Sequence, residues 1–493
     1  MKFRRPICCA RAVTPEPDMD LHLSIDPDQP LAAQLYRQLR EAILGGRLQA
    51  GERLPPSRYL AERLQVSRKT VSEAYEQLLA EGFTSTRVGS GTFVSSLAQT
   101  AAPTRSAATS LLQPAARWRR LPVAPFDSPV QGWRYNFAGG TVSMRRFPLA
   151  AWRTSLQYAL RQMSQGSGFY AGVQGQPALR QAIARYLALN RAVRCDWQDL
   201  LVTQGAQQGL SLLSQVMLEP GDRVAMEEPG YTPARSCFQS AGAEVIGVPV
   251  DDEGLRVDLL PANVRLVYVT PSHQFPLGMP MSLARRLALL EWAREHRVLI
   301  IEDDYDGEFR FQGRPLEALQ SLDRHGLVAY LGTFSKTLYP QQRVGYLLMP
   351  PGLREALVQA KLLGDRHGDS LQQLALAHFM ERGEFARHTR RMQRLYAERR
   401  EHLLLRLQGD LATWLQPIVP MAGIHLAALL RPGVDPERLA SELRGRGIGL
   451  DSLAAFYQGP AQAGLLFGFG CIELDDLQAG LDELRLALQA ACQ

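Results

Sequence analysis

Residues 327–336 read LVAYLGTFSK and end on a lysine, Lys336. The chain holds 55 lysines and arginines together, yet only four of these are lysines. A lysine kept in so arginine-rich a chain indicates a need for an amine that can lose its proton, as Schiff-base chemistry requires. The apolar run 327–331 is typical of a buried parallel strand. Lys336 is therefore predicted just past the carboxyl end of a strand, where open α/β sheets bind ligands.

Size and composition predict several domains and no membrane anchor. The chain has 493 residues, of which 46% are hydrophobic and 21% charged, as in ordinary globular proteins. No apolar run approaches the length of a membrane span, and the first residues lack the apolar core of a signal peptide. The six cysteines are scattered without a metal-binding or disulfide-like spacing. We therefore expect a reduced, cytoplasmic protein without a metal site.

Positive charge is concentrated near the N-terminus. Residues 1–120 hold 17 basic and 11 acidic side chains, whereas the remainder holds 38 of each. The whole net charge of +6 thus lies in the first quarter of the chain. This distribution indicates that the N-terminal part meets a polyanion.

Residues 30–82 predict three helices. Apolar residues recur on one face of the first, which ends at Gly45 and Gly46. Ser57 is expected to cap a second helix, and Ser67 a third. Two short helices joined by a tight turn are typical of a helix-turn-helix, whose last helix enters the major groove. The inward-facing residues of the third helix are expected to be Val71, Ala74, Tyr75, Leu78 and Leu79.

Residues 83–94 alternate in polarity and turn at Gly89 to Gly91, which predicts a two-stranded wing. With the motifs LPPSR, VSRKTV and GSGTFV, residues 20–95 closely resemble the winged helix-turn-helix of the GntR superfamily. The resemblance implies binding to a double-stranded DNA operator. The implied DNA contacts are Arg58, Ser67, Arg68, Lys69, Thr70, Arg87 and Gly89.

A linker and a second domain are predicted after the wing. Residues 96–132 are rich in Ala, Pro, Ser and Thr and show no periodicity, which favours a flexible linker. From about residue 133, short apolar runs alternate with helical stretches, as in a doubly wound, mostly parallel sheet of an α/β protein. Several of these runs lead into polar loops, at residues 203–208, 227–231 and 302–306.

These loops and Lys336 together predict a pyridoxal phosphate site. Lys336 would form the internal aldimine, and Asp303 would keep the pyridine nitrogen protonated so that the ring remains an electron sink. Tyr305 would donate to the phenolic oxygen of the cofactor, and Tyr231 would stack on its ring. The predicted phosphate ligands are Gly205, Ala206, Gln207, Thr333, Ser335 and Arg343.

Residues 133–490 resemble the fold-type I, aspartate-aminotransferase-like domain, in the motifs EEPGY, TPSHQFPLG, IEDDYDGEFR and GTFSKTLYPQQRVGY. Joined to a GntR-type module, this is the layout of the MocR subfamily of bacterial transcription regulators. The resemblance implies a large part at about 133–370 and a small α+β part at about 371–490. Residues 1–19 would be an N-terminal extension. It also implies a homodimer in which Tyr170 reaches the phosphate of the cofactor bound by the partner subunit.

Two departures from working aminotransferases bear on chemistry. Phe275 stands where these enzymes usually carry the asparagine of Asn-Pro-x-Gly. The run GLLFGFG at residues 464–470 lacks the arginine that clamps a substrate carboxylate. His425 is expected to be a packed histidine of the small part rather than a catalytic one.

Three functions remain open at this point. The first is a DNA-binding regulator that senses a small amine, an amino acid or pyridoxal phosphate through the Lys336 aldimine. The second is an active aminotransferase with an accessory DNA-binding domain, in which Lys336 is catalytic; rapid multiple turnover would support it. The third is a sensor of the pyridoxal phosphate level, which the missing arginine favours over an amino-acid sensor.

Overall fold

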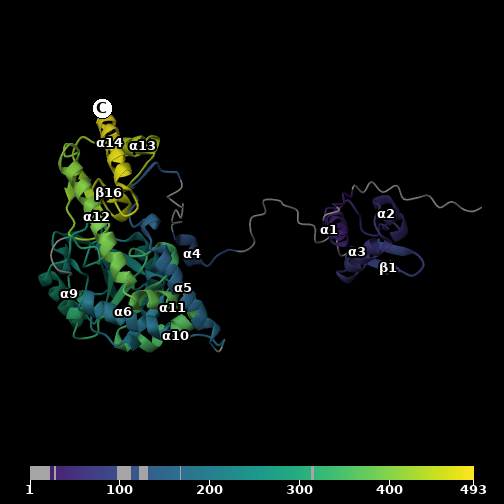
Figure 1. Ribbon diagram of the computed structural model, residues 1–493, viewed down its shortest axis with the longest axis horizontal. Coiled ribbons are helices and arrows are strands. Elements are labelled where there is room, and N and C mark those ends of the chain that lie inside the picture. Colours follow the sequence, from purple (N-terminus) through teal and green to yellow (C-terminus); the bar gives the residue numbers. More distant parts are fainter. Residues whose placement is uncertain are drawn as a thin grey trace, which may run out of the picture. The chain divides into compact units, whose positions relative to one another are not determined.

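The chain folds into two compact units, residues 1–113 and 114–493 (Figure 1). This computed structural model describes residues 23–26, 29–96, 113–121, 132–166, 168–311 and 316–492. The predicted N-terminal extension, with Cys8 and Cys9, and most of the predicted linker lie outside the described residues. Within the linker range a short helix is described, α4 (Ala116–Arg120).

The first unit packs three helices and a hairpin around one apolar core (Figure 1). Its elements are α1 (Leu31–Leu44), α2 (Ser57–Leu64), α3 (Arg68–Ala80), β1 (Thr84–Arg87) and β2 (Gly91–Val94). The two strands pair antiparallel, so the predicted wing is confirmed. The hydroxyl of Ser67 accepts the backbone N–H of Thr70 at 3.1 Å, which is the predicted cap of α3.

Two local expectations for this unit are wrong. Ser57 is the first residue of α2 and makes no capping bond, because Pro56 holds the N-cap position. Leu79 is 43% exposed. Val71, Ala74, Tyr75 and Leu78 already form the inward stripe of α3, and the next position lies at its edge.

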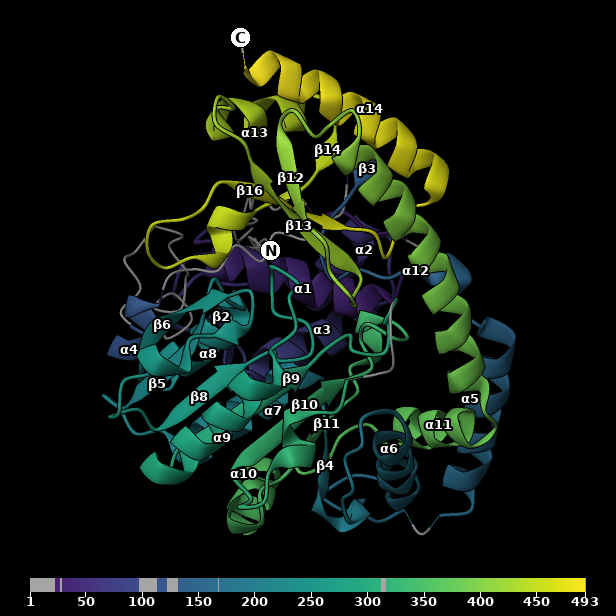
Figure 2. The same cartoon turned by 90° about the vertical axis from the view of Figure 1, so that its left-hand side faces the viewer.

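The second unit is built on an eight-stranded sheet with the order β4-β11-β10-β9-β8-β5-β6-β7 (Figure 2). Neighbours from β10 to β6 pair parallel, whereas β11 is antiparallel to both β10 and β4. The predicted mostly parallel sheet is therefore confirmed. The strands are β4 (Leu200–Thr203), β5 (Arg223–Glu228), β6 (Glu244–Asp251), β7 (Gly254–Leu255), β8 (Leu266–Val269), β9 (Leu299–Asp304), β10 (Val328–Thr333) and β11 (Gly345–Leu348).

Both faces of this sheet are covered by helices because its strands are apolar on both sides. Leu299 and Ile301 face the core under one helical layer, and Ile300 between them faces the core on the other side. The first layer contains α7 (Ala206–Met217), α8 (Thr232–Ser240) and α10 (Arg354–Gly364). The opposite side is covered by α5 (Leu149–Ser164), α6 (Pro177–Asn190), α9 (Leu283–His296) and α11 (Ser370–Glu381).

A smaller part packs beyond one edge of the large sheet (Figure 2). Its antiparallel sheet has the order β12-β13-β16-β15, formed by β12 (Leu415–Ile418), β13 (His425–Leu430), β15 (Asp451–Ser452) and β16 (Gly464–Gly468). Two helices belong to it, α13 (Pro436–Gly445) and α14 (Leu474–Ala491). The long helix α12 (Glu384–Gln408) contributes to the cores of both parts.

The first residues of the second domain pack with the small part. Strand β3 (Tyr135–Asn136) pairs with β14 (Ile448–Gly449), although residues from 133 were expected in the large part. Tyr135 and Phe137 are buried in the small-part core. The segment has no hydrophobic periodicity of its own, so only the pairing with β14 reveals where it belongs.

Strand pairing decides where the polar loops converge. β9 runs through Asp303 to Asp304, and β10 ends at Thr333, three residues before Lys336. The two strands are parallel, with Leu331 opposite Asp303, so their carboxyl ends lie at the same edge. None of the helices in the described ranges combines the length and apolar character that a membrane crossing requires.

Gly332 is a point of close packing between β10 and β11. It lies opposite Tyr346 in the antiparallel register, and a Cβ added to it would stand 2.3 Å from the Tyr346 ring. We expect Gly332→Ala to lower the free energy of unfolding by about 1–3 kcal/mol, because a buried ring has to move. Urea denaturation followed by near-UV circular dichroism measures this.

Gly364→Ala is the matched control, since a Cβ at that helical position meets nothing within 4 Å. It should leave stability unchanged or raise it slightly. In the double variant Gly332→Ala/Tyr346→Ala the ring is absent, so the loss of stability should differ from the sum of the losses in the two single variants. Equal stability of Gly332→Ala and the wild type would contradict the packing argument.

Candidate functional site

A cavity of about 460 Å³ lies at the carboxyl edge of the large sheet, between the two parts of the second unit. Its volume is in the range of small-molecule and cofactor sites. Small-part residues Ile424, His425 and Leu466 form one side. Nine of the sequence-predicted residues line it: Ala206, Gln207, Tyr231, Asp303, Tyr305, Thr333, Ser335, Lys336 and Arg343.

Lys336 presents its amine to this cavity. Its Nζ donates to the carbonyl oxygen of Gly140 at 2.6 Å. Burial lowers the pKa of Lys336, Arg343 lowers it further, and the carboxylates of Asp306 and Asp303 oppose the shift. The net direction favours the neutral amine, which is the nucleophilic form.

Asp303 is the one acid of the run at residues 302–304 that reaches the cavity wall. Its Oδ2 accepts a hydrogen bond from the Tyr268 hydroxyl at 2.7 Å, while Oδ1 is buried without a partner among the described atoms. Burial raises the pKa of this carboxyl to about 7, although Tyr268 and Lys336 lower it. A buried, unpartnered carboxylate oxygen beside a reactive lysine calls for a positively charged or proton-donating ligand.

Each neighbouring acid is held by groups of the protein itself, although Asp304 Oδ1, like Asp303 Oδ1, is buried without a hydrogen-bond partner among the described atoms. Asp304 pairs with Arg191 at 2.6 Å, with both side chains almost fully buried. Glu302 accepts the backbone N–H groups of Leu319 and Gln320, each at 2.8 Å. Alternation along β9 thus separates Asp303 from the two acids that hold the sheet to its surroundings.

Several of the residues predicted to bind phosphate meet at the start of α7. This helix begins at Ala206 and has no side-chain cap, so its first N–H groups remain free for a ligand. Arg343 stands beside it and donates to the carbonyl oxygen of Gln204 at 2.8 Å. Gly205 has a φ of +76°, and a Cβ there would lie 2.7 Å from Arg343 Nη2. Gly205 does not itself line the cavity, but it makes room for the guanidinium.

Thr333 and Ser335 are two further residues predicted to bind phosphate. Their hydroxyl oxygens lie 3.0 Å apart, and the backbone N–H of Ser335 donates to the Thr333 hydroxyl at 3.2 Å. Hydroxyls, free backbone donors and a guanidinium are the groups that bind phosphate.

The predicted aromatic residues Tyr231 and Tyr305 line the cavity, and each also contacts another residue of the protein. The Tyr231 ring lines the wall and packs edge-on against Phe275, with centroids 5.5 Å apart. The Tyr305 hydroxyl donates to the carbonyl oxygen of His273 at 2.9 Å. Phe275, which stands in the asparagine position of working aminotransferases, lines the cavity as well.

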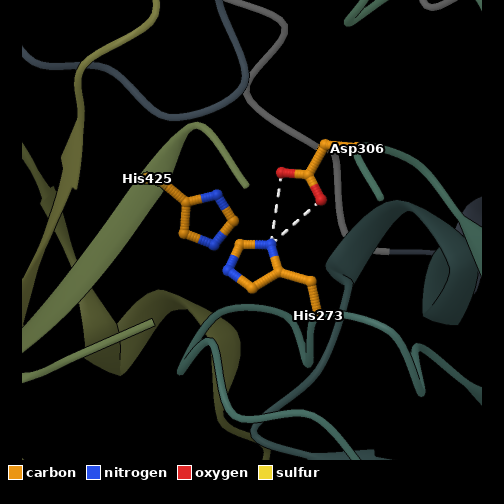
Figure 3. Close-up of side chains that lie close together, drawn as sticks. All are labelled: His273, Asp306 and His425. Atoms are coloured by element: carbon orange, nitrogen blue, oxygen red, sulfur yellow. Dashed lines mark hydrogen bonds and ion pairs between the residues drawn. The ribbon is translucent and has the colours of Figure 1, made fainter. Parts of the chain in front are cut away.

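His273, Asp306 and His425 form a cluster of neighbouring side chains (Figure 3). His273 Nδ1 lies 3.0 Å and 3.2 Å from the two carboxylate oxygens of Asp306, so it donates to them. The ring of His425 lies 4.6 Å from that of His273, and burial lowers the pKa of His425 to about 3. His425 is therefore a neutral, buried residue, as the sequence indicated, but it also lines the cavity.

The same three residues bear on the prediction of no metal site. Among the described residues, His273, Asp306 and His425 form a group whose ligand atoms lie within 4.8 Å of one another. The carboxylate, however, already accepts His273 and the backbone N–H of Ile424 at 3.2 Å. We interpret the cluster as a hydrogen-bonded support for Tyr305.

Tyr170 lies outside the cavity of its own chain. It is 76% exposed, with the Arg366 guanidinium 4.7 Å above its ring and His367 at its edge. Its contribution to a partner subunit stays a prediction.

Sequence reasoning missed several residues of the cavity wall. Gly140, Tyr268, Phe456 and Asp451 carry no motif that marks them, and they come from separate segments of the chain. Only Tyr268 had a local signal, since it lies in an apolar strand that borders β9.

In the first unit, the predicted DNA contacts lie at the start of α3, on the wing and, for Arg58, on α2. Six of the seven are exposed, and Thr70 is half-buried because its hydroxyl lies 2.8 Å from that of Ser67. The Arg87 guanidinium packs 4.9 Å above the Phe93 ring, which supports it on the wing. The roles of these residues stay predictions.

Two protein-family models match the chain. The model of bacterial regulatory proteins of the gntR family matches residues 31–94. The model of class I and II aminotransferases matches residues 136–453.

Several regulators are similar over nearly the whole chain. The probable rhizopine catabolism regulatory protein MocR of Rhizobium meliloti is 38% identical over 474 residues, covering 95% of this chain and 96% of the relative. The pyridoxine biosynthesis transcriptional regulator PdxR of Corynebacterium glutamicum is 35% identical, covering 94% and 98%.

Solved aminotransferases share the fold of the second unit. The kynurenine aminotransferase of Pyrococcus horikoshii, described in complex with PMP, superposes with a TM-score of 0.69 at 27% identity. It covers 78% of this chain and 97% of its own. LysN of Thermus thermophilus, complexed with a phosphopyridoxyl-leucine, gives the same TM-score and identity over 76% and 97%.

Pyridoxal phosphate fits the residues present. The unpartnered Asp303 Oδ1 matches a protonated pyridine nitrogen, and the uncapped start of α7 with Arg343 matches the phosphate. With its two family matches and its full-length regulator relatives, the chain belongs to the MocR subfamily of GntR-type transcription regulators, with pyridoxal phosphate as the cofactor of its aminotransferase-like domain.

Proposed function

We propose that this regulator reads a small-molecule effector at the Lys336 cavity and changes its affinity for a DNA operator in response. The effector is a small amine, an amino acid or pyridoxal phosphate itself. Residues 20–95 bind the operator, residues 96–132 link the two domains, and residues 133–490 bind cofactor and effector. Binding to chromosomal DNA places this function in the cytoplasm.

The proposal rests on one combination of features. Lys336 is placed to react as an amine, but the cavity lacks the residues with which aminotransferases orient a substrate. Burial holds the Lys336 amine toward its neutral form. The cavity wall has Phe275 in the asparagine position, and β16 contributes Leu466 and no arginine. The site can therefore capture a carbonyl or an amine but lacks the clamp that orients an amino acid for rapid turnover.

Different cavity residues are proposed to bind different groups of the cofactor. Pyridoxal phosphate, when bound, supplies an aldehyde carbon that bonds reversibly to primary amines. Lys336 offers an amine whose pKa burial lowers, and the Gly140 carbonyl accepts a hydrogen bond from its Nζ. Asp303 faces a pyridine nitrogen with its free oxygen, and Tyr268 holds the other oxygen in place. The phosphate is bound by the start of α7, Thr333, Ser335 and Arg343.

The response to effector is proposed to run through the small part. Its residues Ile424, His425 and Leu466 face the large-part residues across the cavity, so occupancy changes how the two parts pack. Helix α12 shares its buried face between both cores, with Phe385 in one and Tyr396 in the other. A shift of the small part therefore moves a rigid element anchored in the large part.

A homodimer is proposed from the position of Tyr170. Phe169 and Tyr170 form an aromatic pair that is 87% and 76% exposed, away from the cavity of their own chain. Exposed neighbouring aromatic residues are typical of an interface. In a dimer with shared sites, Tyr170 would reach the phosphate bound by the partner subunit.

Lys336 should be required both for the cofactor band and for the effector response. Wild-type protein given pyridoxal phosphate should show a saturable visible absorption band, and Lys336→Ala should show none. Lys69→Ala, a lysine of the first unit, should keep the band. Affinity for an operator selected from random-sequence DNA should change with effector in the wild type and stay constant in Lys336→Ala. Equal responses of the two proteins would count against the proposal.

The capture of pyridoxal by the cofactor-free protein should depend on pH through Lys336. Because the pKa of Lys336 is lowered, the rate of capture should rise with pH and level off at a pH below 10.5, which is the ordinary pKa of a lysine. Arg343→Gln should move this inflection to higher pH, because removing a nearby cation stabilises the ammonium form. Pyridoxal without phosphate is used so that phosphate binding by Arg343 plays no part. A wild-type inflection at or above 10.5 would show that the amine is solvated like a surface lysine.

Shared sites should be visible by complementation between subunits. Lys336→Ala and Tyr170→Ala chains, co-expressed with different tags, form mixed dimers. One site in each mixed dimer then has both Lys336 and the tyrosine of the other chain. We expect the mixed dimer to bind about half as much pyridoxal phosphate as the wild type, with wild-type affinity, measured by titration of the visible band. Weak binding equal to that of Tyr170→Ala alone would show that each chain uses only its own residues.

A further inference from the structure

The charged groups of the cavity wall leave one acid without a role in cofactor binding. Among the described residues, the wall carries four formally charged side chains, Lys336, Asp303, Arg343 and Asp451. The proposed cofactor site uses the lysine, Asp303 and the arginine. The remaining charge is the carboxylate of Asp451, because His425, which also lines the cavity, is held neutral by burial.

Asp451 and Lys336 line the same cavity and bond to successive residues of one segment. Its Oδ2 accepts the backbone N–H of Gly139 at 3.1 Å, and the carbonyl of the next residue, Gly140, accepts Lys336 Nζ at 2.6 Å. Two residues of chain span at most about 7 Å, so with the two hydrogen bonds the Asp451 carboxylate lies within about 13 Å of Lys336 Nζ. A ligand with one end at Lys336 therefore needs a chain no longer than this to reach Asp451. Burial raises the pKa of Asp451, and a cation beside it would restore the ionised form.

The wall between these two points is apolar and aromatic. Phe275 and Phe456 pack edge to face with ring centroids 5.0 Å apart, and both line the cavity. Leu466 and Ile424 lie on the small-part side. Such a surface accommodates methylene groups, and aromatic faces attract an ammonium group.

We propose that the effector is an amine with a second positive charge and no carboxylate, whose far end pairs with Asp451. The inference rests on the proposed amine sensing at Lys336 and specifies its ligand class. A diamine with a short methylene chain meets all three requirements: an amine for the cofactor, an apolar middle and a cationic end. An ordinary amino acid meets none beyond the first, because its carboxylate would face Asp451 without a guanidinium to offset the repulsion.

The test compares diamines with monoamines of the same length. Putrescine, cadaverine, butylamine and pentylamine are each titrated into wild-type protein loaded with pyridoxal phosphate. γ-Aminobutyrate is titrated in the same way as an amine that carries a carboxylate. Dissociation constants come from the shift of the visible band and from isothermal titration calorimetry, and operator affinity is measured in parallel. We expect each diamine to bind roughly 10- to 100-fold more tightly than its matched monoamine, as one charged hydrogen bond predicts. γ-Aminobutyrate should bind weakest.

Asp451→Asn keeps the shape of the side chain and its acceptor for Gly139 but removes the charge. It should reduce the diamine-to-monoamine preference to near one while leaving monoamine affinity unchanged. Asp476→Asn, an exposed acid on α14, removes the same net charge and should keep the wild-type preference. Asp451→Arg should shift the preference toward γ-aminobutyrate.

Three outcomes would overturn the inference. These are equal affinity for diamines and monoamines in the wild type, an unchanged preference in Asp451→Asn, or tightest binding of γ-aminobutyrate. Amine sensing at Lys336 would survive each of them. Absence of any response to every amine, the monoamines included, would instead overturn the proposed amine sensing and the inference with it.

Discussion

The parallel pairing of β9 with β10 is the constraint on which the second unit depends. It brings Asp303 and the loop carrying Lys336 to one edge of the sheet, although 32 positions separate β9 residue 304 from Lys336 in the sequence. Three consecutive acids can stand at this edge because strand alternation sends them to different partners. Glu302 is held by backbone N–H groups and Asp304 by Arg191, which leaves Asp303 to face a ligand. An acid run in a sheet interior is costly unless each carboxylate is paired.

The balance of charge in the cavity follows from the same arrangement. The buried acids raise the pKa of Lys336, whereas burial and Arg343 lower it, and the lowering dominates. Around this centre the wall changes from the corner proposed to bind phosphate, at the start of α7, to an apolar side on the small part. A catalytic aminotransferase would add a guanidinium on the apolar side, and here that side carries only the carboxylate of Asp451.

The cavity is shared between two parts that each have their own core. Its large-part residues sit on a sheet covered on both faces, which makes them a rigid frame. Its small-part residues lie on β13, β15 and β16 and in the segments next to these strands, and α12 contributes to the cores of both parts. A ligand that bridges the two sides can change their packing without changing either core.

The sequence by itself determined the winged helix-turn-helix, the mostly parallel sheet and nine residues of the cavity wall. These features could be predicted because they depend on local sequence patterns. The patterns are helical and strand periodicity, glycine turns, polar residues at strand ends, and motifs that resemble a known family. Tertiary structure decided what depends on meetings between distant segments. β3 belongs with the small part because β14 offers it a partner, and Asp451 reaches the cavity because Gly139 lies beside it. The hydrogen bonds that His273 makes to Tyr305 and to Asp306 are likewise contacts between separate segments, which local sequence patterns do not indicate.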